Sequence, residues 1–135
     1  MADLHDPAYW DTAILRAAGR LLMLAAFEER PRHGYDIARR LTSVCGDWCT
    51  PSPAMIYPAI HELEAAGLIA CEVESSGGRK RRVCSLTDDG REALRVGIAA
   101  WSRFMPTIAA VLAASGAEVA DCGAAPAACG SPCEE

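Results

Sequence analysis

The stretch Arg32-His-Gly-Tyr-Asp-Ile37 begins the part of the sequence that decides the fold. It is followed by Ser52-Pro-Ala-Met-Ile-Tyr-Pro-Ala-Ile60 and then by Leu63-Glu-Ala-Ala-Gly-Leu-Ile69. In order, these segments predict a helix, a turn, a second helix and the entry to a strand. That order is typical of a winged helix-turn-helix, whose second helix enters the DNA major groove. The predicted fold class is therefore mainly α with a small β-hairpin.

Hydrophobic spacing and terminus signals extend the prediction in both directions. Asp11 is the expected N-cap of a first helix that Pro31 ends, and Ser52 is the expected N-cap of the reading helix, with Pro53 at its first position. Glycines in Ser75-Ser-Gly-Gly78 predict a turn between two strands. The predicted elements are helices over residues 12–29, 34–44, 53–66 and 89–114, and strands over 68–74 and 81–86.

The predicted hairpin has a definite register. If it is symmetric about its turn, Glu74 faces Arg81 and Cys71 faces Cys84. We interpret Cys71 and Cys84 as small buried apolar residues.

The chain is expected to have three parts. Residues 1–87 form the winged helix-turn-helix domain with its N-terminal helix, 88–114 form a C-terminal dimerisation helix, and 115–135 form a flexible, cysteine-rich tail. An apolar stripe on the last helix has little of its own domain left to cover, so it is predicted to bind a partner. The stripe consists of Leu94, Ile98, Trp101, Met105, Ile108 and Leu112.

Composition fits one folded domain, since 51% of the 135 residues are hydrophobic and 23% are charged. No run approaches the roughly 18 consecutive apolar residues of a membrane helix, and the N-terminus has no secretory pattern. We therefore expect a cytoplasmic location. The net charge of −5 does not exclude DNA binding, because residues 116–135 carry four acids and no base.

Two groups of residues are predicted to contact DNA. The outward face of the reading helix, with Ser52 at its start, can contact phosphates or base edges, and a basic run at the hairpin suits phosphates or the minor groove. Alternatively, Tyr57 is a plain hydrophobic helix residue, His61 a solvated one, and the basic run a solvated hairpin tip. The predicted DNA-binding residues are Ser52, Ala54, Tyr57, His61, Arg79, Lys80, Arg81 and Arg82.

Residues 22–94 resemble the PadR family of bacterial transcriptional regulators. The resemblance rests on His33-Gly-Tyr-Asp-Ile37, Met55-Ile-Tyr-Pro-Ala-Ile60 with Leu63-Glu64, Gly67-Leu68-Ile69, and Leu86-Thr-Asp-Asp-Gly-Arg91. The single short C-terminal helix is similar to that of the smaller subgroup.

The resemblance implies a homodimer held by the first and last helices. It implies repression through a palindromic operator, relieved by a ligand or a stress signal, with Tyr57 on the reading helix and Arg79 to Arg82 on the wing. One departure is visible, since the family commonly has aromatic residues where this chain has Val83 and Cys84.

Seven cysteines are many for such a chain, and most stand in two other places. Cys45-Gly-Asp-Trp-Cys49, ahead of the reading helix, and Cys129-Gly-Ser-Pro-Cys133, in the tail, share the pattern Cys-Gly-x-x-Cys. A reducing cytoplasm favours thiol chemistry over a disulfide framework, and soft thiolates select soft ions. The predicted site combines Cys45 and Cys49 with Cys122, Cys129 and Cys133, for As(III) or Sb(III), or else Hg(II) or Zn(II).

Ion binding in the turn before the reading helix would tilt that helix and release the operator. Two alternative effectors stay open: oxidation of the cysteines, and a flat aromatic ligand at the dimer interface near Trp48 and Trp101. A metal carrier that has kept only the fold is a third reading. No enzyme is expected, because His5, His33 and His61 are not placed as a base beside a nucleophile.

Overall fold

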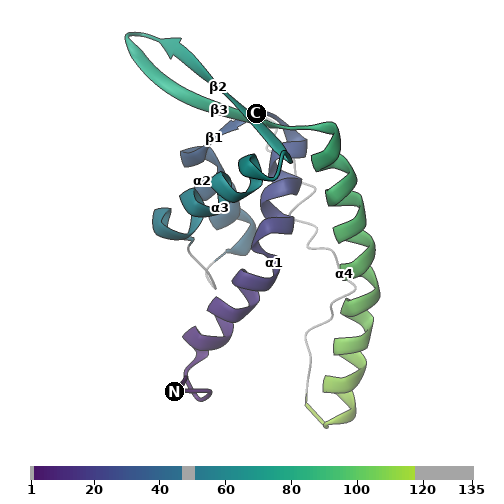
Figure 1. The fold of residues 1–135 in the computed structure, drawn as a ribbon. Helices are drawn as coiled ribbons and strands as arrows, with labels where there is room; N and C mark the ends of the chain where they lie inside the picture. Colours follow the sequence, from purple (N-terminus) through teal and green to yellow (C-terminus); the bar gives the residue numbers. More distant parts are fainter. Residues whose placement is uncertain (1, 47–50, 118–135) are drawn as a thin grey trace, which may run out of the picture. The chain divides into compact units, whose positions relative to one another are not determined.

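The computed structural model describes residues 2–46 and 51–117 of the chain (Figure 1). These residues fall in two compact units, Met1–Arg95 and Val96–Glu135. Four helices and a small antiparallel sheet confirm the predicted mainly α fold class. The elements in chain order are α1 (Pro7–Glu29), β1 (Arg32–His33), α2 (Gly34–Cys45), α3 (Pro53–Ala65), β2 (Ile69–Ser76), β3 (Arg79–Leu86) and α4 (Asp88–Ala114).

The start of α1 differs from the prediction. The N-cap is Asp6, whose carboxylate accepts the N–H of Ala8 at 3.0 Å, and Asp11 lies inside the helix. Asp6 is followed by Pro7, and an N-cap acid with proline at the first helical position is a stronger start than an aspartate in mid-turn. The regular apolar spacing that was used to predict this helix begins only after Asp6 and Pro7.

The other termini lie close to their expected places. Ser52 and Pro53 begin α3 as predicted, although Ser52 makes no side-chain cap hydrogen bond. Gly46 ends α2 with a φ of 68°, a backbone conformation that glycine adopts without a steric cost. Pro58 lies inside α3 on its exposed side, and the helix continues past it.

The core of the first unit lies where α1, α2, α3 and the sheet meet. Ile37 and Ile56 are almost completely buried, as the helical spacing predicted, and Phe27 of α1 joins them. Ile14 and Val44 are exposed although they are apolar. The core residues are Met23, Leu24, Ala26, Phe27, Ile37, Leu41, Ile56, Ile60, Leu63, Ile69, Cys84, Leu86 and Leu94.

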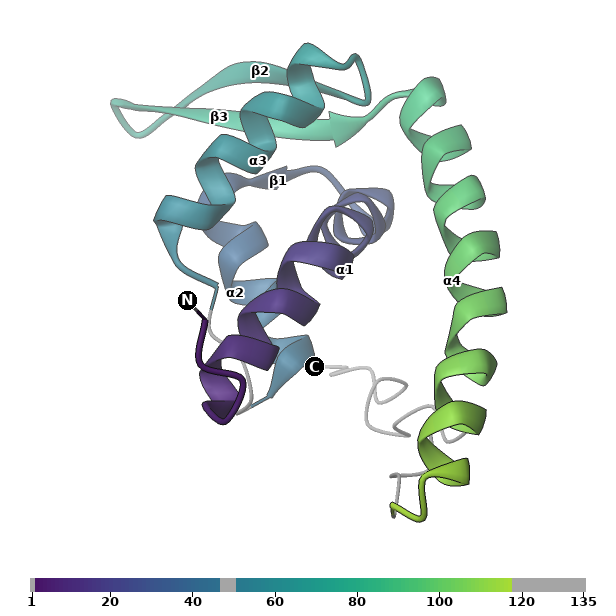
Figure 2. The same ribbon diagram turned by 60° about the horizontal axis from the view of Figure 1, so that its bottom comes forward.

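The sheet has the strand order β1-β3-β2, with all pairs antiparallel. Its register confirms the predicted pairs, since Glu74 faces Arg81 and Cys71 faces Cys84. The β2–β3 hairpin, which we call the wing, extends beyond α1, α2 and α3 (Figure 2). The prediction missed β1, because a two-residue strand has no periodicity of its own and exists through its pairing with β3.

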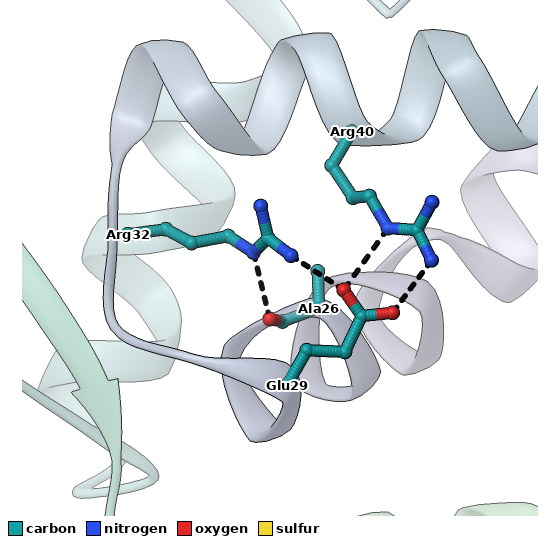
Figure 3. A network of polar contacts seen from close by, with 4 residues as sticks. All are labelled: Ala26, Glu29, Arg32 and Arg40. Atoms are coloured by element: carbon teal, nitrogen blue, oxygen red, sulfur yellow. Dashed lines mark hydrogen bonds and ion pairs between the residues drawn. The ribbon is translucent and has the colours of Figure 1, made fainter. Parts of the chain in front are cut away.

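A buried arginine fixes the junction between α1, β1 and α2 (Figure 3). Arg32 is 5% exposed, and its Nε donates to the carbonyl of Ala26 at 2.8 Å. Its guanidinium also pairs with Glu29, which receives two further hydrogen bonds from Arg40 of α2, at 2.6 and 3.0 Å. These bonds, Arg40's first among them, hold the pKa of Glu29 below its ordinary value. The network ties β1 and α2 to the end of α1.

The first turn of α4 is fastened to the end of α3 through Thr87. Its hydroxyl donates to the carbonyl of Gly67 at 2.7 Å and accepts the N–H of Gly90 at 3.0 Å, so Thr87 caps α4. Gly90 is buried so closely that a Cβ would stand 2.1 Å from the carbonyl oxygen of Leu68. Only glycine fits there.

From Val96 onward α4 belongs to the second unit, and the apolar side chains of this part of the helix are largely exposed. Ile98, Met105, Ile108 and Leu112, which belong to the predicted stripe, are among them. By length and composition this helix could also cross a membrane, since its most apolar 18-residue window has a mean hydropathy of 1.4. The sequence prediction still holds that no run of about 18 consecutive apolar residues occurs, because Arg95 and Arg103 interrupt the apolar part of this helix. One such helix does not by itself distinguish a membrane span from a helix that a protein partner covers.

Candidate nucleic-acid interface

One side of α3 packs on the core and the other is free. Ile56, Ile60 and Leu63 are buried, at the i, i+4 and i+7 spacing of one helix face. The side chains predicted to read DNA lie on the exposed side or at the helix start, and they are Ser52, Ala54, Tyr57 and His61. A helix so anchored presents a fixed outer side to a partner, which is what major-groove binding requires.

Tyr57 is held by α2 and does not hang free in solvent. Its side chain is 49% exposed, and its ring packs on Gly34, where a Cβ would stand 2.7 Å from Cε1. Tyr57 is therefore packed against α2 on one side, as a hydrophobic helix residue would be, and is exposed to a partner on the other.

A recess of about 660 Å³ joins this part of α3 to α2 and the wing. Its wall contains four arginines and one aspartate, so its formal charge is +3 with histidine neutral. A concave, positive surface between two helices and a hairpin suits a nucleic-acid backbone. The lining residues are His33, Gly34, Tyr35, Asp36, Arg39, Tyr57, Arg79, Arg81 and Arg82.

The predicted DNA-binding residues divide into two groups around this recess. Tyr57, Arg79, Arg81 and Arg82 line it together. The other predicted residues are not among its lining, and they are Ser52, Ala54, His61 and Lys80.

The sequence analysis missed the contribution of α2 to this surface. Tyr35 is 68% exposed, and the guanidinium of Arg39 lies 5.8 Å from the centre of its ring. The stacked ring limits the positions that Arg39 can take. The i, i+4 spacing of the two residues was the available signal, but it did not show which side of α2 faces the wing.

The wing arginines are not equivalent. Arg82 hydrogen-bonds Glu64 of α3, with Nη2 at 2.7 and 2.8 Å from the two carboxylate oxygens. Its backbone carbonyl lies 3.2 Å from Nδ1 of His33. Arg82 thus joins the wing to α3 and β1, and its Nη2 becomes available to a phosphate only when the pair with Glu64 opens.

The predicted metal ligands lie almost entirely outside the described residues. Cys45 is the last residue of α2, and nothing is described of its side chain. Cys49, Cys122, Cys129 and Cys133 fall in the segments 47–50 and 118–135, which the structure does not describe. Within residues 2–46 and 51–117, no group of three or more potential ligands comes together. The metal site stays a prediction.

The wing cysteines are joined by a disulfide between Cys71 and Cys84. Cys84 is 3% exposed and belongs to the core, while Cys71 is half-buried against it, which agrees with the predicted small apolar role. The expectation of reduced thiols in the wing was wrong for this pair. Directly opposed positions on antiparallel strands bring two Cβ atoms close enough for a bond, and here the Cα atoms are 3.9 Å apart.

The family model described as "Transcriptional regulator PadR-like family" matches residues 22–96, which is more than half of the chain. The chain belongs to the PadR family. The matched range covers α2, α3 and the wing completely, so it contains every residue that lines the recess.

Relatives and solved structures agree with this membership. "Transcriptional regulator Rv3488" of Mycobacterium tuberculosis is 39% identical over 67 residues, half of each chain. "Transcriptional regulator YqjI" of Escherichia coli is 32% identical over 75 residues, 56% of this chain and 35% of its own length. The match thus spans half or less of these two relatives.

Among crystal structures, a PadR-family transcriptional regulator from Eggerthella lenta superposes with a TM-score of 0.70 at 25% identity. The superposition covers 78% of this chain and 90% of that one. The family and these relatives are transcriptional regulators and not enzymes, which confirms the expectation drawn from the sequence.

Proposed function

We propose that this PadR-family chain is a homodimeric repressor that binds a palindromic operator and is released by a soft metal or metalloid ion. The observation that carries the DNA-binding part is the recess lined by Tyr57, Arg39 and the wing arginines. In this proposal α3 enters the major groove, and the wing follows the adjacent backbone or minor groove.

Charge and shape support this orientation. The recess has a formal charge of +3 although the whole chain carries −5, so this surface is positive on a chain that is acidic overall. Contacts to phosphates give affinity that falls with salt, whereas contacts from the outward face of α3 give sequence preference.

Two exposed apolar surfaces support the homodimer. The first half of α1 exposes Tyr9, Trp10 and Ile14. The part of α4 in the second unit exposes Ile98, Phe104, Met105, Ile108 and Leu112. A second copy that covers such surfaces places two α3 helices on one face of the duplex, about 34 Å apart, so that each reads one half-site.

The proposed effector site uses Cys45 and Cys49 with Cys122, Cys129 and Cys133. Its support is the pattern Cys-Gly-x-x-Cys, which occurs twice, and the place of Cys45 at the end of α2, directly before the connection to α3. Thiolates bind As(III), Sb(III) and Hg(II) tightly, and zinc accepts four of them. An ion held in that connection favours a different α3 orientation, and release requires it to bind the off-DNA state more tightly.

DNA binding is tested by fluorescence anisotropy on duplexes that cover the region upstream of the chain's own coding sequence. We expect Tyr57→Ala to reduce sequence preference and Arg81→Ala to weaken binding to all duplexes, with a salt slope smaller by about 1. Arg30→Ala is the control, since it removes an exposed charge that is not part of the recess. Specific binding that is insensitive to both test variants would place the interface elsewhere.

The dimer is tested by light scattering in detergent-free buffer. We expect twice the chain mass for the wild type and a shift toward monomer for Ile108→Glu. Ala110→Glu introduces the same charge on the opposite side of α4 and should leave the mass unchanged. A wild-type monomer, or a chain soluble only in detergent, would contradict the homodimer.

The effector is tested by release from DNA in the presence of arsenite, antimonite, mercury, cadmium or zinc. Release by one of these ions that is lost in Cys45→Ser/Cys49→Ser supports the thiolate site. Cys71→Ser is the matched control and should keep the response. Release that is identical in Cys45→Ser/Cys49→Ser would exclude this site as the sensor.

An aromatic effector is the second candidate. Trp101 and Phe104 meet edge to face on α4 with ring centres 5.5 Å apart, beside an apolar hollow of about 280 Å³. A flat ligand stacks on such a pair. Release by phenolic compounds that is lost in Trp101→Ala, with Cys45→Ser/Cys49→Ser unaffected, would favour this candidate.

A further inference from the structure

We propose that Cys71 and Cys84 form a reversible thiol–disulfide pair that peroxides oxidise, and that this bond sets how firmly the wing is held for DNA binding. The inference rests on the proposed DNA-binding function. It names a pair of cysteines distinct from those of the proposed metal site.

The pair lies where the wing joins the body of the first unit. β3 is the central strand, and Cys84 pairs with Arg32 of β1 on one side and with Cys71 of β2 on the other. Arg32 is in turn anchored on α1 through Ala26 and Glu29. The disulfide therefore joins β2 covalently to β3 at Cys84, the residue where β3 also pairs with β1.

Beyond this point the wing is held to the rest of the first unit by the ion pair of Arg82 with Glu64 and by the contact of the Arg82 carbonyl with His33. The pairing of β1 with β3 ends at His33 and Val83, and the remaining hairpin is a two-stranded ribbon. Arg79, Lys80, Arg81 and Arg82 are all exposed on it. A two-stranded ribbon without a core is marginally stable by itself, so a bond across its base has a large effect on its order.

The two sulfurs differ in access to solvent, which assigns them different roles. Cys71 is half-buried and meets the oxidant first, while Cys84 is 3% exposed. The Cys71 thiolate attacks hydrogen peroxide, which breaks the O–O bond and gives a sulfenic acid and hydroxide. The Cys84 thiol then gives its proton to that hydroxide, which forms the first water, and its thiolate attacks the sulfenic sulfur. The hydroxide that departs from this sulfur takes up the proton that Cys71 released on ionising, which forms the second water. In sum, two thiols and one peroxide give one disulfide and two waters.

Reduction by a dithiol reverses the bond without unfolding the chain. The other core residues, among them Phe27, Ile37 and Ile56, do not depend on the sulfur–sulfur bond for their burial. The hairpin ladder also remains, because its backbone pairs run from Ile69 to Ser76. The two states therefore differ chiefly in the freedom of the ribbon that carries Arg79 to Arg82.

An ordered wing favours DNA binding. A mobile ribbon must be fixed when its arginines bind phosphates, and this cost is lower when the disulfide has already restricted it. We therefore expect the oxidised protein to bind the operator about three- to tenfold more tightly than the reduced protein.

The test compares full-length protein reduced by dithiothreitol with the same protein treated with hydrogen peroxide. Peptide mass spectrometry reads the bond directly, since trypsin cleaves at the basic residues between Cys71 and Cys84 and only a disulfide keeps the two fragments together. Anisotropy on the upstream duplex then gives the affinity of each state. Cys71→Ser removes the pair, Cys45→Ser/Cys49→Ser leaves it intact, and circular dichroism checks that each variant is folded.

The inference is supported if the linked peptide forms, oxidised protein binds more tightly, and only Cys71→Ser abolishes the difference. It is overturned if peroxide yields no linked peptide, or if the bond forms and the affinity stays the same. If neither state binds DNA, the proposed function fails and the regulatory role fails with it, although the mass spectrum still shows whether the pair oxidises. A difference that persists in Cys71→Ser assigns the redox response to other cysteines and overturns this one.

Discussion

The ring of Tyr57 on α3 lies directly against Gly34, the first residue of α2, with no room for a Cβ between them. A Cβ on Gly34 would stand 2.7 Å from Cε1 of Tyr57 and 3.4 Å from Cδ1 of Ile60. The absence of a side chain at one helix start thus sets the position of an aromatic ring on the next helix. That ring is part of the proposed DNA-binding surface.

We expect Gly34→Ala to weaken DNA binding more than it lowers stability. The added methyl displaces the Tyr57 ring toward solvent, while the better helix propensity of alanine, up to about 1 kcal/mol, offsets part of the strain. Thermal unfolding and anisotropy measure the two effects. In a Tyr57→Ala background the same substitution should no longer change affinity. Equal losses of affinity in both backgrounds would contradict the contact.

Gly90→Ala should be strongly destabilising. A Cβ there would stand 2.1 Å from the Leu68 carbonyl oxygen and 2.6 Å from Cδ1 of Leu86, and backbone cannot yield as a flexible side chain can. Overpacking of this kind costs about 1–3 kcal/mol. Gly19→Ala in α1 is the matched control, since nothing lies within 4 Å of its Cβ position and alanine favours a helix. Urea unfolding of both variants checks this, and equal stabilities would contradict the close approach.

Local signals were sufficient to predict most of the fold. Ser52 with Pro53 marked the start of α3, and the turn before Arg79 fixed the register that pairs Cys71 with Cys84. These signals act between neighbours in sequence. β1 gave none, because its two residues form a strand only when β3 lies beside them.

Only part of the candidate site could be predicted, because some of its residues are brought together by contacts that local sequence signals do not show. Tyr57 and the wing arginines follow from helix periodicity and a basic run, both of which are local. Tyr35 and Arg39 line the same recess, but the side of α2 that faces the wing depends on contacts between elements that lie far apart in the sequence. Nor did the register show that Cys71 and Cys84 are bonded, because pairing brings sulfurs together without fixing their oxidation state.

Arg32→Ala should unfold the junction between α1 and α2. The side chain is 5% exposed, and its loss leaves the Ala26 carbonyl and Glu29 without their buried donor. Leaving buried polar groups without a partner costs about 1–3 kcal/mol. Arg30→Ala, two residues earlier and exposed, should change stability by less than about 0.5 kcal/mol. Chemical denaturation gives both values, and a tolerated Arg32→Ala would show that the network is dispensable.

Glu29 should give stability that is lost in acid. Its pKa is lowered from 4.5, first by the hydrogen bonds from Arg40. Its contribution to the free energy of unfolding is therefore complete above pH 4.5 and disappears as the pH falls through the lowered pKa. Because the side chain is 42% exposed and screened, we expect less than about 1 kcal/mol. Unfolding measured from pH 6 to pH 3 should show a gap between wild type and Glu29→Gln that closes toward acid. A gap that stays constant would mean that the charge of Glu29 does not matter.

Glu64→Gln should strengthen DNA binding. The carboxylate of Glu64 holds Nη2 of Arg82 at 2.7 and 2.8 Å, so this nitrogen cannot bind a phosphate until the pair opens. An amide holds the guanidinium less strongly, and removing an acid beside the recess also lowers repulsion of DNA. We expect affinity to rise about two- to fivefold at low salt, with a steeper salt dependence. Glu62→Gln is the matched control, because it removes the same charge from the same helix but frees Arg20 of α1 instead. If both variants gain equally, the change in net charge is the cause, and the Glu64–Arg82 pair does not restrain the wing.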